Sequence, residues 1–147
     1  MSSANIAIVS TYFYPEKTAA ANRLYVLASA LSEKYRVRVY TAVEDPQAAQ
    51  EALERLDPAF SVEYARKKFF AVGNYLKRFL REFSLCLRIF RSIDFSDDPL
   101  VLVSVPSIFI VPLFFRKAKH HAMILDVRDL QWEYLINQGS LLSTLTG

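Results

Sequence analysis

The sequence is poor in the residues that build disulfides and metal centres. Cys86 is its only cysteine, so no disulfide forms within the chain and no cysteine cluster can hold a metal. The two histidines, His120 and His121, are adjacent, which is poor spacing for two ligands of one metal ion. We therefore expect no metal site. As a separate expectation, the chain carries no bound cofactor.

The sequence also lacks a strong charge of one sign, a targeting segment and the glycine-rich phosphate-binding motifs. Its net charge is only +3 over 147 residues, too small to indicate nucleic-acid binding. The start, MSSANIAIVS, has neither the basic residues nor the longer apolar stretch of a signal peptide, which predicts a cytoplasmic protein. Neither GxGxxG nor GxxxxGK[ST] occurs, so the dinucleotide and P-loop motifs are missing.

One apolar run resembles a membrane span. No charge occurs from Pro99 to Phe115, and the basic stretch RKAKHH follows. The run is short for a bilayer and contains Pro106 and Pro112. A buried strand, a turn and a buried helix therefore explain it better, and a small membrane protein is kept as the weaker alternative.

The sequence does contain predicted strands that alternate with predicted helices, which is typical of an α/β domain. Hydrophobic residues make up 52% of the 147 positions, which suits a single folded domain spanning residues 1–147. Strands are predicted at Asn5–Thr11, Val37–Val43, Phe60–Arg66, Pro99–Pro106 and His121–Val127. Helices are predicted at about Thr18–Lys34, Asp45–Leu56, Asn74–Ile93 and Ser107–Ala118, and another begins near Trp132.

This order predicts parallel strands joined by right-handed crossovers, that is, a doubly wound, mainly parallel sheet with helices on both faces. The alternating third strand is expected near an edge. Ligands of such sheets bind outside the carboxyl ends of the strands. Three loops meet there: Tyr12–Thr18, Val105–Ser107 and Asp126–Trp132.

The first of these loops leads into a helix N-terminus, where free N–H groups and the helix dipole favour an anion. The small residues Ala19, Ala20 and Ala21 would let a phosphate or a sugar approach the backbone. The alternative is an ordinary strand-to-helix turn whose alanines serve helix propensity.

The third loop comes directly after the apolar stretch MIL. It contains three charged residues, Asp126, Arg128 and Asp129. Arg128 could grip a phosphate or carboxylate with two hydrogen bonds. Either aspartate could accept hydrogen bonds from sugar hydroxyls or orient Arg128. The alternatives are a local ion pair that fixes the loop, or Asp129 as a helix N-cap.

Two segments together resemble a known family. IAIVSTYFYPEKTAAANRLYVLASALSEKYRVRVYT is similar to the opening of family-4 retaining glycosyltransferases of the two-domain GT-B fold, and ILDVRDLQWE is similar to their DVRDLWPE segment. The match is closest to the branch that makes bacterial surface polysaccharides. The resemblance implies a nucleotide-sugar donor, a lipid-linked or saccharide acceptor, and no metal.

The resemblance also implies site residues. Tyr14, Pro15 and Glu16 match the family's PPE loop, Thr18–Ala21 its small-residue turn facing the donor diphosphate, and Arg23 its helix arginine. Asp126, Arg128, Asp129 and Glu133 match the segment that lines the acceptor side of the cleft.

The chain also departs from the family. Thr18 replaces a frequent glycine, Tyr35-Arg36 replaces a Gly-His pair, Trp132 is displaced by one position, and Arg128 stands where many relatives have a histidine. No catalytic residue is therefore assigned. Because the donor is held mainly by a second domain that nothing here resembles, we expect the chain to be an N-terminal, acceptor-side domain, incomplete as a catalyst on its own.

A basic, aromatic helix is the last feature. At helical spacing, Lys77, Arg81, Ser84, Arg88 and Arg91 share one stripe, with Lys67 and Lys68 just before the helix. The opposite stripe contains Leu76, Phe79, Leu80, Phe83, Cys86, Leu87 and Phe90. Such a segment suits an anionic membrane surface, and the alternative is an ordinary crossover helix, apolar toward its sheet.

Two main hypotheses follow. The first is the N-terminal domain of a glycosyltransferase at the inner face of the cell membrane, acting in surface polysaccharide synthesis. The second is a self-sufficient, flavodoxin-like domain that binds a nucleotide or phosphate without catalysis.

Overall fold

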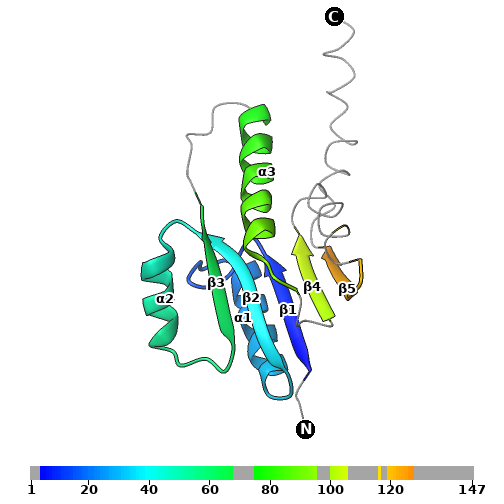
Figure 1. Ribbon diagram of the computed structural model, residues 1–147. Helices are drawn as coiled ribbons and strands as arrows, with labels where there is room; N and C mark the ends of the chain where they lie inside the picture. The colour runs from blue at the N-terminus through cyan, green and yellow to red at the C-terminus, as the bar shows by residue number, and fades with distance from the viewer. Residues whose placement is uncertain (1–3, 68–74, 96–99, 106–115, 117–118, 128–147) are drawn as a thin grey trace, which may run out of the picture.

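The structure is a computed structural model that describes residues 4–67, 75–95, 100–105, 116 and 119–127, without the side chains of residues 75–79, 81–82 and 105 (Figure 1). Its strands are β1 (Asn5–Ser10), β2 (Arg36–Val43), β3 (Ser61–Arg66), β4 (Leu100–Val105) and β5 (Ala122–Val127). Its helices are α1 (Ala19–Ser32), α2 (Pro46–Glu54) and α3 (Tyr75–Ser92).

The five strands form one sheet in the order β3-β2-β1-β4-β5, and every pairing is parallel. The predicted α/β, doubly wound, parallel fold is therefore confirmed. The chain runs from β1 outward to β3, and then returns past β1 to β4 and β5. The strand order thus reverses between β1 and β4, which makes the crevice at their carboxyl ends the topological switch point of the sheet.

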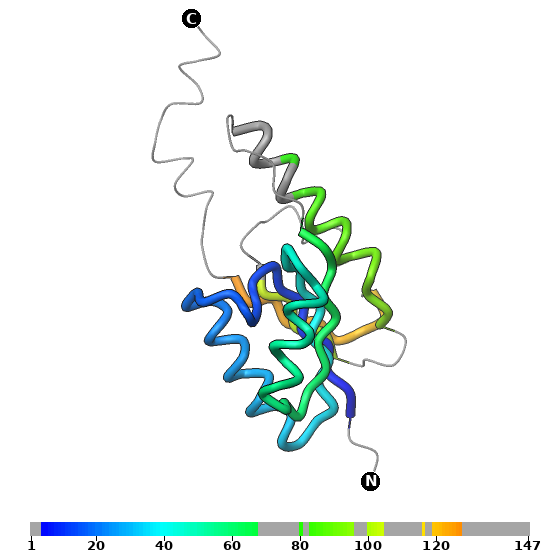
Figure 2. The backbone as a smooth tube through the Cα atoms, turned by 90° about the vertical axis from the view of Figure 1, so that its left-hand side faces the viewer, coloured from blue at the N-terminus to red at the C-terminus, as the bar shows by residue number. Residues whose placement is uncertain are grey.

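Helices cover both faces of the sheet. Neighbouring residues of each strand point to opposite faces, so they pack against different helices. Ile6 and Ile8 pack with Leu24 of α1 and Leu53 of α2 on one face. Ala7 and Val9 of β1 pack with residues of α3 on the other. Figure 2, turned by 90° from Figure 1, shows α1 and α3 on opposite sides of the sheet. Strand β1 is buried on both faces, as its continuous apolar run predicts.

Strand β3 lies at one edge of the sheet, as its alternating sequence predicts. Ser61 and Glu63 are exposed, whereas Val62 between them is buried. The observed bounds of the other strands and helices differ from the predicted ones by only a few residues. The predicted helices at Ser107–Ala118 and near Trp132 lie outside the described residues, apart from the single position 116.

Helix α3 fits the alternative of an ordinary crossover helix only in its second half. Its second half packs on the sheet through Cys86, Ile89 and Phe90, but Leu80 and Phe83, expected on the same apolar side, are 54% and 37% exposed. The reason is length, since 18 helical residues span about 27 Å and six strand residues about 20 Å. The first turns of α3 therefore project beyond the carboxyl edge of the sheet (Figure 1).

Within the described ranges, no helix is both long enough and apolar enough to cross a membrane. The apolar run from Pro99 to Phe115 contributes strand β4 to the sheet centre, where Val101 and Val103 are 0% and 1% exposed. Its remaining residues, from 106 onward, lie outside the described part of the chain.

Candidate functional site

Three polar side chains lie in a row at the switch point. The parallel register places Ser10 of β1 beside Ser104 of β4, and Ser104 beside Asp126 of β5. The Ser104 hydroxyl donates a hydrogen bond of 2.9 Å to Asp126 Oδ2. Because each strand ends near this row, the three side chains mark the carboxyl edge where the fold binds ligands.

Arg23 reaches this row from helix α1. Its Nη2 donates to Asp126 Oδ1 at 2.5 Å, so both oxygens of the carboxylate are hydrogen-bonded. The Arg23 side chain remains 59% exposed, whereas that of Asp126 is only 20% exposed. A guanidinium has five N–H donors in a planar fork. The contact with Asp126 therefore uses one nitrogen of the guanidinium, in a side chain that is largely exposed.

The N-terminus of α1 lies one turn before Arg23. Thr18 is the N-cap, and its hydroxyl accepts a hydrogen bond of 3.1 Å from the Ala21 N–H. The N–H groups of Ala19 and Ala20 have no carbonyl four residues earlier within the helix. Ala19 is exposed and Ala20 half-buried. This helix end therefore presents positive partial charge at the carboxyl edge of the sheet, which we call the rim.

The loop between β1 and α1 is anchored internally. The Ser10 hydroxyl donates to the Tyr12 carbonyl and accepts from the Tyr12 N–H. Phe13 is fully buried against the rings of Tyr25 and Phe60. The Glu16 N–H donates to the Phe13 carbonyl at 3.0 Å, and the peptide bond before Pro15 is cis.

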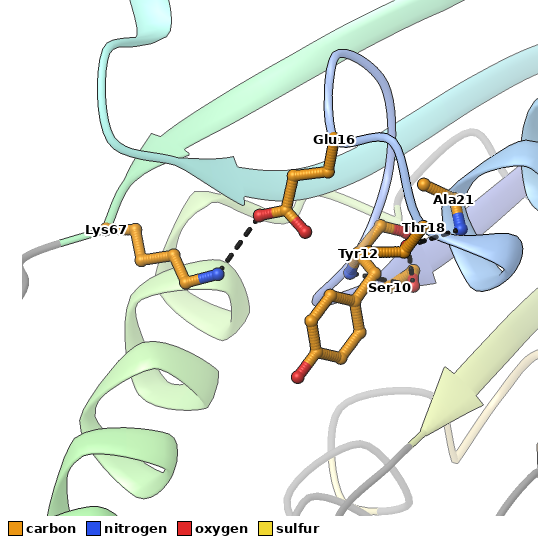
Figure 3. A network of polar contacts seen from close by, with 6 residues as sticks. All are labelled: Ser10, Tyr12, Glu16, Thr18, Ala21 and Lys67. Carbon is orange, nitrogen blue, oxygen red and sulfur yellow. Dashed lines mark hydrogen bonds and ion pairs between the residues drawn. The ribbon is translucent and has the colours of Figure 1, made fainter. Parts of the chain in front are cut away.

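Strand β3 holds the same loop from outside. The Tyr64 hydroxyl donates to the Tyr14 carbonyl at 2.9 Å, and Lys67 Nζ lies 3.1 Å from Glu16 Oε1. Lys67 Nζ also lies 5.4 Å from the centre of the Tyr12 ring (Figure 3). Burial raises the pKa of Tyr64 well above its usual range, and the neighbouring Tyr14 and Tyr25 add to the rise.

A small hollow of about 10 Å³ opens on the α3 side of the switch point, with room for about one water molecule. Its walls come from the ends of β1 and β4 and from Cys86 and Ile89 of α3. Thr11, which is 6% exposed, lines it, and the Thr11 hydroxyl has no hydrogen-bond partner among the described residues.

The structure brings together only some of the residues singled out by the sequence. Arg23 and Asp126 meet, whereas Glu16 pairs with Lys67. Tyr14 contributes its carbonyl to the loop contacts, and Pro15 is exposed. Thr18, Ala19, Ala20 and Ala21 form the helix start. Arg128, Asp129 and Glu133 lie outside the described residues.

Of the six cations assigned to a membrane surface, the structure describes the side chains of Lys67, Arg88 and Arg91. The side chain of Lys67 is 17% exposed and pairs with Glu16. Arg88 donates to the Arg66 carbonyl at 3.1 Å, while Arg91 is exposed. Lys68 and the side chains of Lys77 and Arg81 lie outside the described part.

Sequence reasoning missed Ser10, Thr11, Ser104 and Tyr64. For the first three a signal exists, because hydroxyl residues end two otherwise apolar strands, in IVST and VLVS. Tyr64 gives no such signal, since its contact spans 50 residues. Within the described residues, no group of three or more histidine, cysteine or acidic side chains could hold a metal ion.

No family model and no curated protein matches this sequence. Among solved structures, the C-terminal domain of a hydrogenase from Pyrococcus furiosus aligns with a TM-score of 0.56 at 17% sequence identity. The alignment covers 86% of this chain and 94% of that one. At this identity the likeness shows the shared fold alone.

Proposed function

We propose that this chain is the acceptor-side domain of a retaining, nucleotide-sugar-dependent glycosyltransferase of surface polysaccharide synthesis. The observation that carries the proposal is the Arg23–Asp126 pair. It joins the two segments that resemble the glycosyltransferase family, 103 residues apart in sequence, at the switch point of the sheet. A ligand there would meet both segments at once.

The chemistry at this rim suits an anionic ligand. The start of α1 and the exposed guanidinium of Arg23 favour phosphate oxygens. Ser10 and Ser104 at the same edge are buried, and their hydroxyls bond the Tyr12 backbone and Asp126. A lipid-linked saccharide carries a diphosphate, and so does the nucleotide-sugar donor, whose diphosphate the family resemblance places at the start of α1. In the complete enzyme, the nucleotide-sugar donor would be held mainly by a second domain.

The second candidate function is a flavodoxin-like module that binds a nucleotide or phosphate without catalysis. The same helix start and the same parallel sheet favour it. The two functions differ in the ligand, because the module needs no saccharide acceptor.

Calorimetric titration of the chain separates the two functions. The probes are a short-chain prenyl-diphosphate saccharide and flavin mononucleotide. The glycosyltransferase proposal expects binding of the prenyl-linked saccharide, weakened about tenfold by Arg23→Gln, a loss of about 1.4 kcal/mol. Arg36→Gln is the matched control, because Arg36 is exposed at the opposite edge of the sheet, where β2 begins. Binding of the flavin alone would favour the module, and binding of neither probe would count against both.

We also propose that the domain works at the inner face of the cell membrane, where a lipid-linked acceptor lies. The support is helix α3, whose sequence from Tyr75 to Ser92 contains five lysines and arginines and one glutamate. Leu80 and Phe83, both in the first half of this helix, are exposed. The first turns of α3 project beyond the carboxyl edge of the sheet (Figure 1). Apolar side chains among cations are what an anionic lipid surface attracts.

A further inference from the structure

We propose that Lys67 is a positioning residue, which acts from the end of β3 to fix the β1–α1 loop and, through it, the N-terminus of α1. Neither the membrane role assigned to it from sequence nor the family resemblance includes this function. The inference concerns the shape of the free protein. Only its consequence for ligand binding rests on the proposed function.

The backbone of Lys67 is itself well placed to act as an anchor. Lys67 directly follows β3, and its N–H donates to the Val43 carbonyl at 2.6 Å, which continues the pairing of β3 with β2. The position of the Lys67 backbone is therefore fixed by its hydrogen bonding to the sheet. The Lys67 side chain thus extends from a well-ordered point of the backbone.

The side chain of Lys67 spans two points of the loop. Its ammonium lies 3.1 Å from the Glu16 carboxylate and 5.4 Å from the centre of the Tyr12 ring (Figure 3). The Lys67 and Glu16 side chains are only 17% and 25% exposed. Partial burial lowers the effective dielectric constant and strengthens the attraction between the charges. Removal of the amine would leave Glu16 partly buried without this cation.

Glu16 lies two residues before the N-cap of helix α1. Glu16 closes a turn onto the Phe13 carbonyl, and Thr18, two residues later, is the N-cap. An ion pair that holds Glu16 therefore restrains the first N–H groups of α1. The Tyr64 hydroxyl restrains Tyr14 from the same strand, so β3 holds the loop at two separate points.

Amide hydrogen exchange of the ligand-free chain tests this role. The reporters are the hydrogen-bonded amides of Tyr12 and Glu16, and the references are those of Ile8 and Val39 in the sheet centre. Lys67→Met keeps the apolar stem but removes the charge, and it is expected to speed exchange of both reporters at least tenfold while the references stay unchanged. Lys17→Met is the matched control, because Lys17 is exposed and adjacent to Glu16 in the same loop.

Rescue separates positioning from general destabilisation. Lys67→Arg, and the charge reversal Glu16→Lys with Lys67→Glu, are expected to return the reporters to within about threefold of the wild type. Equal exchange in Lys67→Met and the wild type would overturn the proposal. So would equal acceleration of the reporter and reference amides, or failure of both rescue variants.

A titration with the short-chain prenyl-diphosphate saccharide then links Lys67 to binding. We expect Lys67→Met to bind it about fivefold more weakly than Lys17→Met does. If the wild type binds no saccharide, the proposed function fails, and the exchange result still decides the positioning role. If the exchange result holds but the affinities of the two variants are equal, the link between loop position and binding is wrong.

Discussion

Arg23 and Asp126 form an ion pair that connects helix α1 to strand β5 across the carboxyl edge of the sheet. Asp126 also accepts a hydrogen bond from Ser104, so a single carboxylate connects α1, β4 and β5. The aspartate is the less exposed member, which indicates that it holds the arginine in place. Asp126, the charged residue directly after the apolar stretch MIL, therefore belongs to the rim, and its partner Arg23 lies 103 residues away in sequence.

A double-mutant cycle measures this pair. We expect Asp126→Asn to lower the free energy of unfolding by about 1 kcal/mol, because an ion pair and part of a charge-assisted hydrogen bond are lost. The coupling with Arg23→Gln should be about 0.5 kcal/mol, since the arginine is largely exposed. Urea denaturation gives both numbers, with Glu33→Gln on the exposed end of α1 as the control. A coupling of zero would contradict the prediction that this pair stabilises the fold.

The N-cap of α1 yields a second prediction. Thr18→Ala removes the acceptor for the Ala21 N–H and should cost about 1 kcal/mol in unfolding free energy. Thr18→Ser keeps the hydroxyl and should lie within about 0.3 kcal/mol of the wild type. The same denaturation experiment checks this. Equal losses in the two variants would show that the hydroxyl does not cap the helix.

Tyr64 yields a prediction about pH. Burial raises the pKa of Tyr64 in the folded state. The folded protein therefore keeps the hydroxyl proton at pH values where the unfolded chain, with a pKa of about 10, has lost it. The contribution of Tyr64 is therefore complete below that pH and is lost as the pH rises above it. Tyr64→Phe should be less stable than the wild type at pH 8, by about 1 kcal/mol for the lost hydrogen bond.

The difference between Tyr64→Phe and the wild type should then narrow between about pH 9 and pH 11. Denaturation midpoints measured across this range check the trend. Tyr35→Phe serves as the control, because Tyr35 is 39% exposed and follows the end of α1. A constant difference for Tyr64→Phe across the range would contradict the raised pKa.

Helix α3 yields a prediction about membrane binding. Leu80→Ser should weaken co-sedimentation with phosphatidylglycerol-containing vesicles severalfold, because it removes an apolar side chain from the projecting, cationic helix. Its unfolding free energy should stay within about 0.5 kcal/mol of the wild type. Leu56→Ser is the matched control, because Leu56 is 49% exposed near α2, outside α3. Equal loss in both variants, or equal binding to phosphatidylcholine vesicles, would count against a specific contact of α3 with an anionic surface.

The fold could be predicted because its signals are local. The apolar run of β1, the helical spacing of Leu24 and Ala28, and the alternation of β3 each depend on a few neighbouring residues. The order of strand and helix then restricts the sheet to a parallel arrangement. The exposure of Leu80 could not be predicted in this way, because periodicity shows which residues share a side of a helix but not where the sheet ends.

The candidate site could be predicted only as a set of separate segments. Chain order places Arg23 and Asp126 at the same edge, but their contact depends on the register of β4 with β5 and on the position of α1. The pairing of Lys67 with Glu16 was not predicted for the same reason. A charge just before an amphipathic helix suggests a surface role until the fold brings an acidic partner to it, 51 residues away.

If the two motif segments form one ligand site at the carboxyl edge of the sheet, a bound ligand must affect both of them. An amide NMR titration of the wild-type chain with a short-chain prenyl-diphosphate saccharide tests this. We expect saturable shifts of the Ala19, Ala20 and Arg23 amides together with those of Ser104 and Asp126, all with one dissociation constant. Saturable binding that leaves one of the two segments unchanged, or that shifts amides away from this edge, would contradict it.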